Sequence, residues 1–293
     1  MNFAAYSQTL LAPFEDFLLH SLPRLAPQAA KLEEAMRYSL LAGGKRLRPL
    51  LLLATLEAAG KPAELGYATA CALEYIHTYS LIHDDLPCMD NDDLRRGLPT
   101  NHIVFGEDMA LLAGDGLLTE AFRLLSQQTQ LPPEVCLNLI RLLSTKAGNF
   151  GMVAGQAADI SAAKQQQDQK LLEFIHFHKT GQLITASLEA AGLIAGLNPA
   201  ALGHLVAFGE QVGRCFQIQD DILDCTGTDQ ELGKPAGSDE RNQKLTYPSL
   251  FGLEVSRRLA QEALAQALAE LAQTGLEQRR LIELAEYVVT RNK

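Results

Sequence analysis

The 293-residue sequence lacks the features that would place it in a membrane, in an oxidising compartment or on nucleic acid. No apolar run is long enough for a bilayer span, and Glu15 and Asp16 stand where a signal peptide would be apolar. The five cysteines are odd in number and include no CxxC pair, which suits a reducing compartment. The net charge of −10 argues against non-specific nucleic-acid binding. We therefore expect a cytoplasmic protein with no membrane segment and no nucleic-acid partner.

Alternating strand patterns and linkers rich in proline or serine are also lacking. Apolar residues make up 47% of the chain, enough for a substantial core, and they recur at helical spacing. One apolar stripe lies on residues 32–40 and is followed by Gly43 and Gly44, as expected at a helix C-terminus. The sequence therefore predicts an all-α protein, with residues 1–293 forming a single domain of about ten helices.

The remaining helices can be placed approximately from the same periodicity. They are predicted at 3–20, 46–59, 63–83, 110–129, 133–149, 168–195, 199–224, 245–273 and 276–290. Three stretches break the helical pattern, at 84–107, 151–166 and 225–244. The last of them is rich in glycine and polar residues, which is typical of a mobile loop.

The first of these stretches opens with a dense acidic segment, HDDLPCMDNDDLRRG, from His83 to Gly97. Clustered carboxylates repel one another unless a cation lies among them. Asp90 follows Asp84 by six residues, and Pro87 makes an unbroken helix between them unfavourable. A local bulge of two residues would return Asp90 to the side of Asp84, as in a four-residue helical spacing.

A second acidic segment, FQIQDDILD, lies in a predicted apolar helix. Asp220 and Asp224 are four residues apart and share a helix face, with Asp221 about 100° round. Carboxylates in an apolar setting need a cation, and a structural salt-bridge cluster explains this segment alone equally well. Two helices that each offer paired carboxylates suit Mg²⁺, which prefers oxygen ligands and often bridges to phosphates.

Basic residues that could hold a phosphate-bearing substrate are spread along the sequence. Arginine binds phosphate with two parallel hydrogen bonds, although a solvated surface position is the commoner explanation for any single Lys or Arg. The candidates are Lys45, Arg46, Arg48, Arg95, Arg96, Lys179, Lys234 and Lys244.

The combined motifs resemble the polyprenyl synthetase family, the trans-isoprenyl diphosphate synthases. The segments that carry the resemblance are GGKRLRP, DDLPCMDNDDLRRG, GDGLL, KTGQL, FQIQDDILD and GKPAGSDERNQKLTYP. The resemblance implies an all-α bundle around a central cavity (the isoprenoid synthase fold), and a homodimer. Within the family, the chain is most similar to the bacterial short-chain enzymes that make the fifteen-carbon farnesyl diphosphate.

The resemblance also assigns roles to individual residues. The aspartates would hold Mg²⁺, three ions per site, on the allylic diphosphate; they are Asp84, Asp85, Asp90, Asp220, Asp221 and Asp224. The same diphosphate would contact Arg95, Lys179 and Lys234, with Lys244 nearby. The residues implied to bind isopentenyl diphosphate are Lys45, Arg48, His77 and Arg96. Thr180 and Gln217 would line the path of the carbocation.

Tyr79, five residues before Asp84, is implied to set product length together with its neighbour Ser80. Five helical residues span about 7.5 Å, so a ring there could close the cavity below the metals. The expected reaction is ionisation, condensation and elimination, giving farnesyl diphosphate. Three alternatives stay open: a geranylgeranyl diphosphate synthase, a class I terpene cyclase and a non-catalytic partner subunit.

Overall fold

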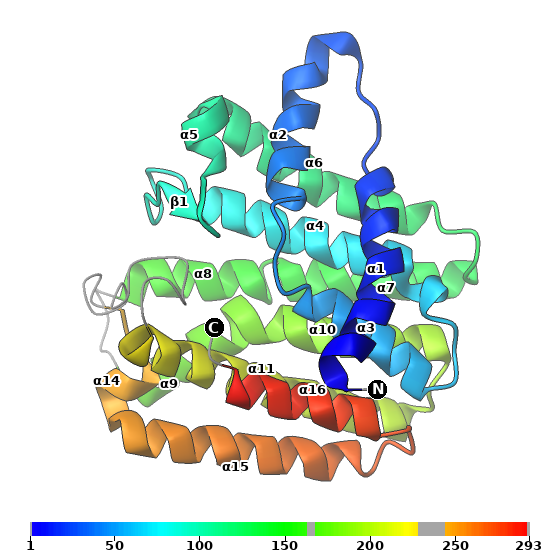
Figure 1. Cartoon of the computed structure of the whole chain (residues 1–293), viewed down its shortest axis with the longest axis vertical. Coiled ribbons are helices and arrows are strands. Elements are labelled where there is room, and N and C mark those ends of the chain that lie inside the picture. Colours follow the sequence, from blue (N-terminus) through cyan, green and yellow to red (C-terminus); the bar gives the residue numbers. More distant parts are fainter. Residues whose placement is uncertain (1, 163–167, 228–243, 292–293) are drawn as a thin grey trace.

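The computed structural model describes residues 2–162, 168–227 and 244–291. The helices of the first half are α1 (Phe3–Ser21), α2 (Ala30–Leu40), α3 (Leu47–Ala58), α4 (Tyr67–Asp84), α5 (Asn101–Phe105), α6 (Glu107–Ser126) and α7 (Pro133–Ala147). Those of the second half are α8 (Met152–Ser161), α9 (Gln169–Ile175), α10 (Gln182–Ala195), α11 (Pro199–Thr226), α14 (Tyr247–Phe251), α15 (Leu253–Leu271) and α16 (Arg279–Thr290). The prediction of an all-α fold is confirmed (Figure 1).

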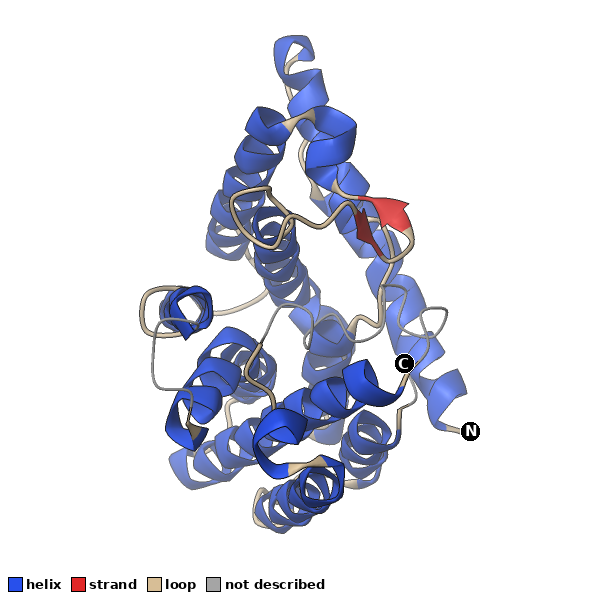
Figure 2. Ribbon diagram, turned by 90° about the vertical axis from the view of Figure 1, so that its left-hand side faces the viewer, coloured by secondary structure: helices blue, strands red, loops and turns tan. Residues whose placement is uncertain are grey.

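Short elements connect these helices. The 3-10 turns η1 (Pro27–Ala29) and η2 (Ala63–Gly66) precede α2 and α4, and a π-helical turn, η4 (His176–Gly181), joins α9 to α10. Strands β1 (Leu94–Arg95) and β2 (Leu98–Pro99) pair antiparallel, with Arg95 opposite Leu98. This small ribbon projects from the helical body near the C-terminal end of α4 (Figures 1 and 2).

The core follows from helices that are apolar on most of their surface. In α3 every residue from Leu50 to Leu56 is buried, and α10 buries nearly all of its length. Helix α4 packs along α6, while α11 packs against both α10 and α15. In Figure 1 these pairs form successive layers, with α4 and α6 above α10 and α11. The acidic segments therefore end or interrupt two helices of this core, α4 and α11.

The structure corrects three of the predicted boundaries. The stretch 151–166 was expected to be irregular, but Met152–Ser161 forms helix α8. Gly155 lowers the helix propensity of this stretch. A glycine is required there because a Cβ would lie 2.2 Å from the backbone nitrogen of Lys179. The predicted helix 168–195 contains the π-helical turn, and 245–273 divides at Gly252, which has φ 76°. Most of the predicted loop 225–244 lies outside the described residues.

Candidate active site

The bulge predicted between Asp84 and Asp90 is present. The backbone N–H of Asp90 donates to the carbonyl of Asp84 at 2.8 Å, a bond that spans six residues instead of the usual four. Asn91 then reverses the chain with φ 54°, in the left-handed region. The two extra residues return Asp90 to the C-terminal end of α4. Asp84, Asp85 and Asp90 therefore lie together at that end of the helix.

Asp84 lies against α8. The side-chain amide of Gln156 donates to Asp84 Oδ1 at 2.7 Å. Burial raises the pKa of Asp84 to about 6, and the positive charge of Lys179 opposes that rise. The like charge of Asp90 raises the pKa further. The charged form of Asp84 is therefore incompletely compensated by protein groups, as expected at a place where a cation binds.

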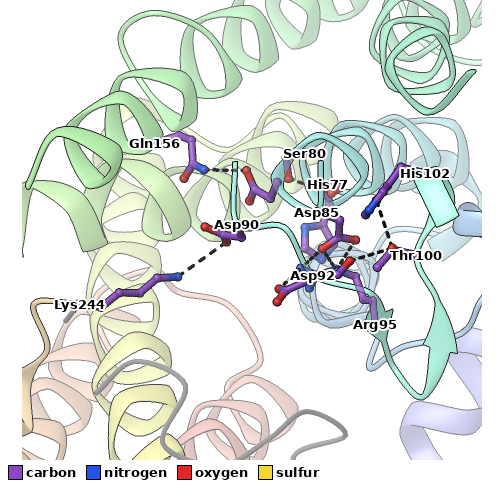
Figure 3. Close-up of polar contacts among 11 residues, drawn as sticks. His77, Ser80, Asp85, Asp90, Asp92, Arg95, Thr100, His102, Gln156 and Lys244 are labelled. Atoms are coloured by element: carbon purple, nitrogen blue, oxygen red, sulfur yellow. Dashed lines mark hydrogen bonds and ion pairs between the residues drawn. The ribbon is translucent and has the colours of Figure 1, made fainter. Parts of the chain in front are cut away.

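Asp85 is buried and paired with Arg95 of strand β1. Arg95 Nε donates to both carboxylate oxygens at 2.8 Å, and Arg95 also lies 3.9 Å from Asp92 (Figure 3). On the other side of the segment, Lys244 Nζ lies 3.7 Å from Asp90 Oδ2, and Figure 3 shows Lys244 reaching toward Asp90 from a separate part of the chain. Arg95, which the resemblance assigns to the allylic diphosphate, and Lys244, which it places nearby, thus both contact the first acidic segment.

The second acidic segment sits near the C-terminal end of α11. Asp220 is half-exposed and accepts a hydrogen bond from Arg291 Nη2 at 3.0 Å. Asp221 and Asp224 are buried. One oxygen of Asp221 accepts from the backbone nitrogen of Tyr247 at 2.8 Å, and Gln217 Nε2 donates to the other at 3.2 Å. The predicted metal ligands of this segment therefore differ in exposure and in their contacts, with Asp220 the most accessible.

A cavity of about 370 Å³ is lined by several of the predicted site residues. Its lining includes Arg48, His77, Tyr79, Ser80, Asp84, Gln156, Lys179 and Thr180. The π-helical turn η4 presents Lys179 and Thr180 to this cavity, and π turns inside helices often occur at functional sites. The second acidic segment, which includes Gln217, does not line it, and of the first acidic segment's predicted ligands only Asp84 does. The other predicted site residues outside the lining are Lys45, Asp85, Asp90, Arg95, Arg96 and Lys244. Lys234 lies outside the described residues.

One end of this cavity is cationic. Burial lowers the pKa of Arg48 to about 10, and nearby Arg96 lowers it as well. Burial and the charges of Arg48, Arg96, Arg95 and Arg46 hold the pKa of His77 well below its usual value. His77 is therefore a neutral imidazole near pH 7. Arg95 and Arg46 are paired with Asp85 and Glu74, whereas Arg48 lines the cavity with the positive charge of Arg96 nearby. Guanidinium groups held close together suit an anion such as a diphosphate.

Arg46 does not belong to that anion site, although it lies between Lys45 and Arg48 in the GGKRLRP segment. Its backbone is left-handed, with φ 48°, and its side chain enters the core. Arg46 Nη1 donates to Glu74 of α4 at 2.8 Å, and Nη2 donates to the carbonyl of Leu40 at 3.0 Å. Arg46 thus anchors the segment, while Arg48 faces the cavity.

Two polar residues of the site were missed in the sequence. Gln156 contacts Asp84, and Asp159 accepts from Lys179 Nζ at 2.6 Å. Both come from α8, a helix that the sequence pattern does not predict. Their spacing of three residues, which puts two side chains on one helix face, was the available signal.

Comparison with known proteins identifies the family. The polyprenyl synthetase model matches residues 29–285. The chain belongs to the polyprenyl synthetase family. It is 50% identical to farnesyl diphosphate synthase from Geobacillus stearothermophilus over 265 residues, covering 90% of this chain and 89% of that one. It is 44% identical to geranylgeranyl diphosphate synthase from Cyanophora paradoxa, covering 95% and 93%.

Solved structures extend the likeness to the whole fold of this polyprenyl synthetase. An FPP/GFPP synthase from Zymomonas mobilis has a TM-score of 0.88 and 37% identity, with 99% of each chain covered. Prenyltransferases of this family are typically metal-dependent. No helix in the part of the chain that the structure describes is both long and apolar enough to cross a bilayer.

Proposed function

We propose that this protein is a farnesyl diphosphate synthase, a trans-prenyltransferase that condenses allylic diphosphates with isopentenyl diphosphate. The observation that carries the proposal is a single cavity whose lining includes Arg48 and His77 at its cationic end, and also Asp84 and Tyr79. A metal-free diphosphate suits the cationic end, and a metal-bound diphosphate suits the carboxylates. Relatives named farnesyl diphosphate synthase, about half identical to this chain, support the proposal.

We further propose Mg²⁺ as the metal, three ions per site, held by the two acidic segments. The donors are the carboxylates of Asp84, Asp85, Asp90, Asp220, Asp221 and Asp224. Among the described residues no three acidic, histidine or cysteine side chains converge closely enough to hold a metal ion by themselves. Waters and substrate phosphates would have to supply further ligands, as they usually do for Mg²⁺. The raised pKa of Asp84, caused by burial, also fits a cation that would compensate its charge. When bound, Mg²⁺ would neutralise the departing diphosphate.

The residues of the chain would then act as follows. Gln156 fixes the orientation of Asp84, and Lys179 and Arg95 add positive charge beside the allylic diphosphate. Arg48 and neutral His77 hold isopentenyl diphosphate so that its double bond faces the allylic carbon. The allylic carbon–oxygen bond breaks first, and its electron pair leaves with the diphosphate. The double bond of isopentenyl diphosphate then attacks the allylic cation and forms the new carbon–carbon bond. The proton lost afterwards goes to the released diphosphate, with Thr180 and Gln217 along the cation's path.

A reaction in which each reactant is omitted in turn tests this proposal. The purified chain should convert dimethylallyl diphosphate only when isopentenyl diphosphate and Mg²⁺ are both present. A hydrocarbon or alcohol formed from allylic substrate alone would instead indicate a terpene cyclase. The cationic end at Arg48 and His77 argues against a cyclase, because a cyclase needs no second, metal-free diphosphate site. Inactivity of the single chain under all conditions would indicate a partner subunit.

Product length is the finer part of the proposal, since relatives of this chain include geranylgeranyl diphosphate synthases. Tyr79 is almost fully buried yet lines the cavity. Burial and the nearby charge of Asp84 raise the pKa of Tyr79 to about 12, so its ring is neutral. We assign Tyr79 as the floor that stops elongation at fifteen carbons, with Ser80 beside it.

We also propose a homodimer in the cytoplasm. Ile103 and Val104 of α5 and Leu111 and Leu112 of α6 are exposed and apolar, and a second copy would cover them. Light scattering should give twice the mass of one chain, and Leu112→Glu should give a single chain. An unchanged mass for that variant would place the interface elsewhere.

A further inference from the structure

We infer that His83 is a positioning residue that determines product length, because it links α4 to α6 and holds the ring of Tyr79 in place. The inference rests on the proposed function, in which Tyr79 closes the far end of the prenyl cavity. His83 would touch neither diphosphate in this role. It would act through Tyr79.

His83 and Tyr79 lie on one face of α4. They are four residues apart, so their side chains are neighbours along the helix. Their ring centroids are 5.7 Å apart with an interplanar angle of 79°, an edge-to-face contact. Both side chains line the cavity that contains Asp84 and Lys179. The imidazole therefore supports one side of the aromatic floor.

His83 is itself fixed by α6. Its Nε2 lies 3.0 Å from the carbonyl oxygen of Leu111. A carbonyl can only accept, so Nε2 carries the hydrogen in this contact. The bond ties the end of α4, immediately before the first acidic segment, to the neighbouring helix.

The backbone of α6 leaves room for this ring only because residue 114 is glycine. A Cβ at Gly114 would lie 2.0 Å from His83 Nε2 and 2.4 Å from its Cδ2. The imidazole thus lies directly on the helix, in space that any other residue would occupy. This contact gives a physical reason for the first glycine of the GDGLL segment.

These contacts connect α6 to the cavity wall: Gly114 and Leu111 contact His83, and His83 contacts Tyr79. With the imidazole in place, the ring of Tyr79 cannot move toward α6 without displacing it. Without the imidazole, that space becomes continuous with the cavity. The floor would then be able to turn aside for a longer prenyl chain.

The test measures the ratio of twenty-carbon to fifteen-carbon product for three variants and one control variant. His83→Ala removes the support and should raise the ratio about tenfold, which needs only about 1.4 kcal/mol in the partition between release and further elongation. Gly114→Ala leaves α4 unaltered but displaces the imidazole, and it should shift the ratio in the same direction. His83→Gln keeps a donor for the Leu111 carbonyl and should stay close to the wild-type ratio. Ile82→Val, a small truncation in the adjacent residue, is the matched control.

The ratio separates this role from a general structural effect, because a loss of activity alone lowers both products together. Unchanged ratios in both His83→Ala and Gly114→Ala would overturn the inference. A lengthened product in Ile82→Val would also overturn it, since the effect would then not be specific to His83. If Tyr79→Ala lengthens the product while His83→Ala does not, the proposed function stands and only the role of His83 fails. If Tyr79→Ala has no effect, the floor itself is misassigned.

Discussion

Replacing Glu74 with glutamine should destabilise the protein strongly and weaken the isopentenyl diphosphate site. Arg46 is 5% exposed and Glu74 is 3% exposed, and their 2.8 Å contact supplies the only carboxylate in hydrogen-bond range of this guanidinium among the described residues. Glu74→Gln keeps the shape but leaves the buried guanidinium with the more distant and half-exposed carboxylate of Glu15, 3.7 Å from Arg46 Nε. Removing one partner of a buried ion pair costs about 3–5 kcal/mol. For a chain of this size that corresponds to a fall in Tm of about 5–8 °C.

The assay compares unfolding in denaturant with the kinetics of each substrate. Because Arg46 anchors the segment that carries Lys45 and Arg48, the KM for isopentenyl diphosphate should rise more than that for the allylic substrate. Glu120→Gln is the matched control: its partner Arg123 is 42% exposed, so the loss should be within about 1 kcal/mol. A paired replacement, Arg46→Met with Glu74→Leu, should recover most of the lost stability, since apolar pairs can replace buried ion pairs. A Glu74→Gln variant as stable as Glu120→Gln would show that the buried ion pair of Arg46 and Glu74 does not stabilise the fold.

Three further outcomes are expected. Arg48→Ala should raise the KM for isopentenyl diphosphate at least about tenfold more than the KM for the allylic substrate, because charge-assisted bonds to one anion are lost. Equal effects on the two KM values would mean that the two diphosphate sites are misassigned. Asp84→Asn should stabilise the metal-free protein at pH 7, because burial raises the pKa of Asp84 above its unfolded value and its charged form opposes folding. The gain in stability should shrink as the pH falls from about 6 toward 4. A gain that is independent of pH in urea unfolding would contradict that cause. Tyr79→Ala should extend the product to twenty carbons or beyond, read by chromatography, and an unchanged fifteen-carbon product would place the floor elsewhere.

The sequence predicted those parts of the site that depend on spacing along one helix. The bulge between Asp84 and Asp90 followed from their six-residue separation and Pro87. In the structure the backbone N–H of Asp90 donates to the carbonyl of Asp84 across this bulge. The helix bounds followed from apolar periodicity wherever the period was unbroken, as in α3 and α11.

Features that depend on contacts between helices could not be predicted in this way. Helix α8 was missed because Gly155, which lowers helix propensity, is there to admit the backbone at Lys179. The basic residues of GGKRLRP look alike in sequence, and only the left-handed backbone at Arg46 sends one of them into the core. The contact of His83 with Gly114 joins residues 31 positions apart, and no local pattern connects them.

The length of the prenyl product made by the purified wild-type protein is the most direct test of the proposed farnesyl diphosphate synthase activity. Dimethylallyl diphosphate, isopentenyl diphosphate and Mg²⁺ are incubated with the protein, and the dephosphorylated products are separated by chromatography. The fifteen-carbon alcohol should dominate. Asp84→Ala and Asp220→Ala should each reduce its formation by orders of magnitude, because each removes a proposed metal ligand. Twenty-carbon product from the wild type would contradict the assignment of Tyr79 as the floor. Near-wild-type turnover in either aspartate variant at saturating Mg²⁺ would contradict the two-segment metal site itself.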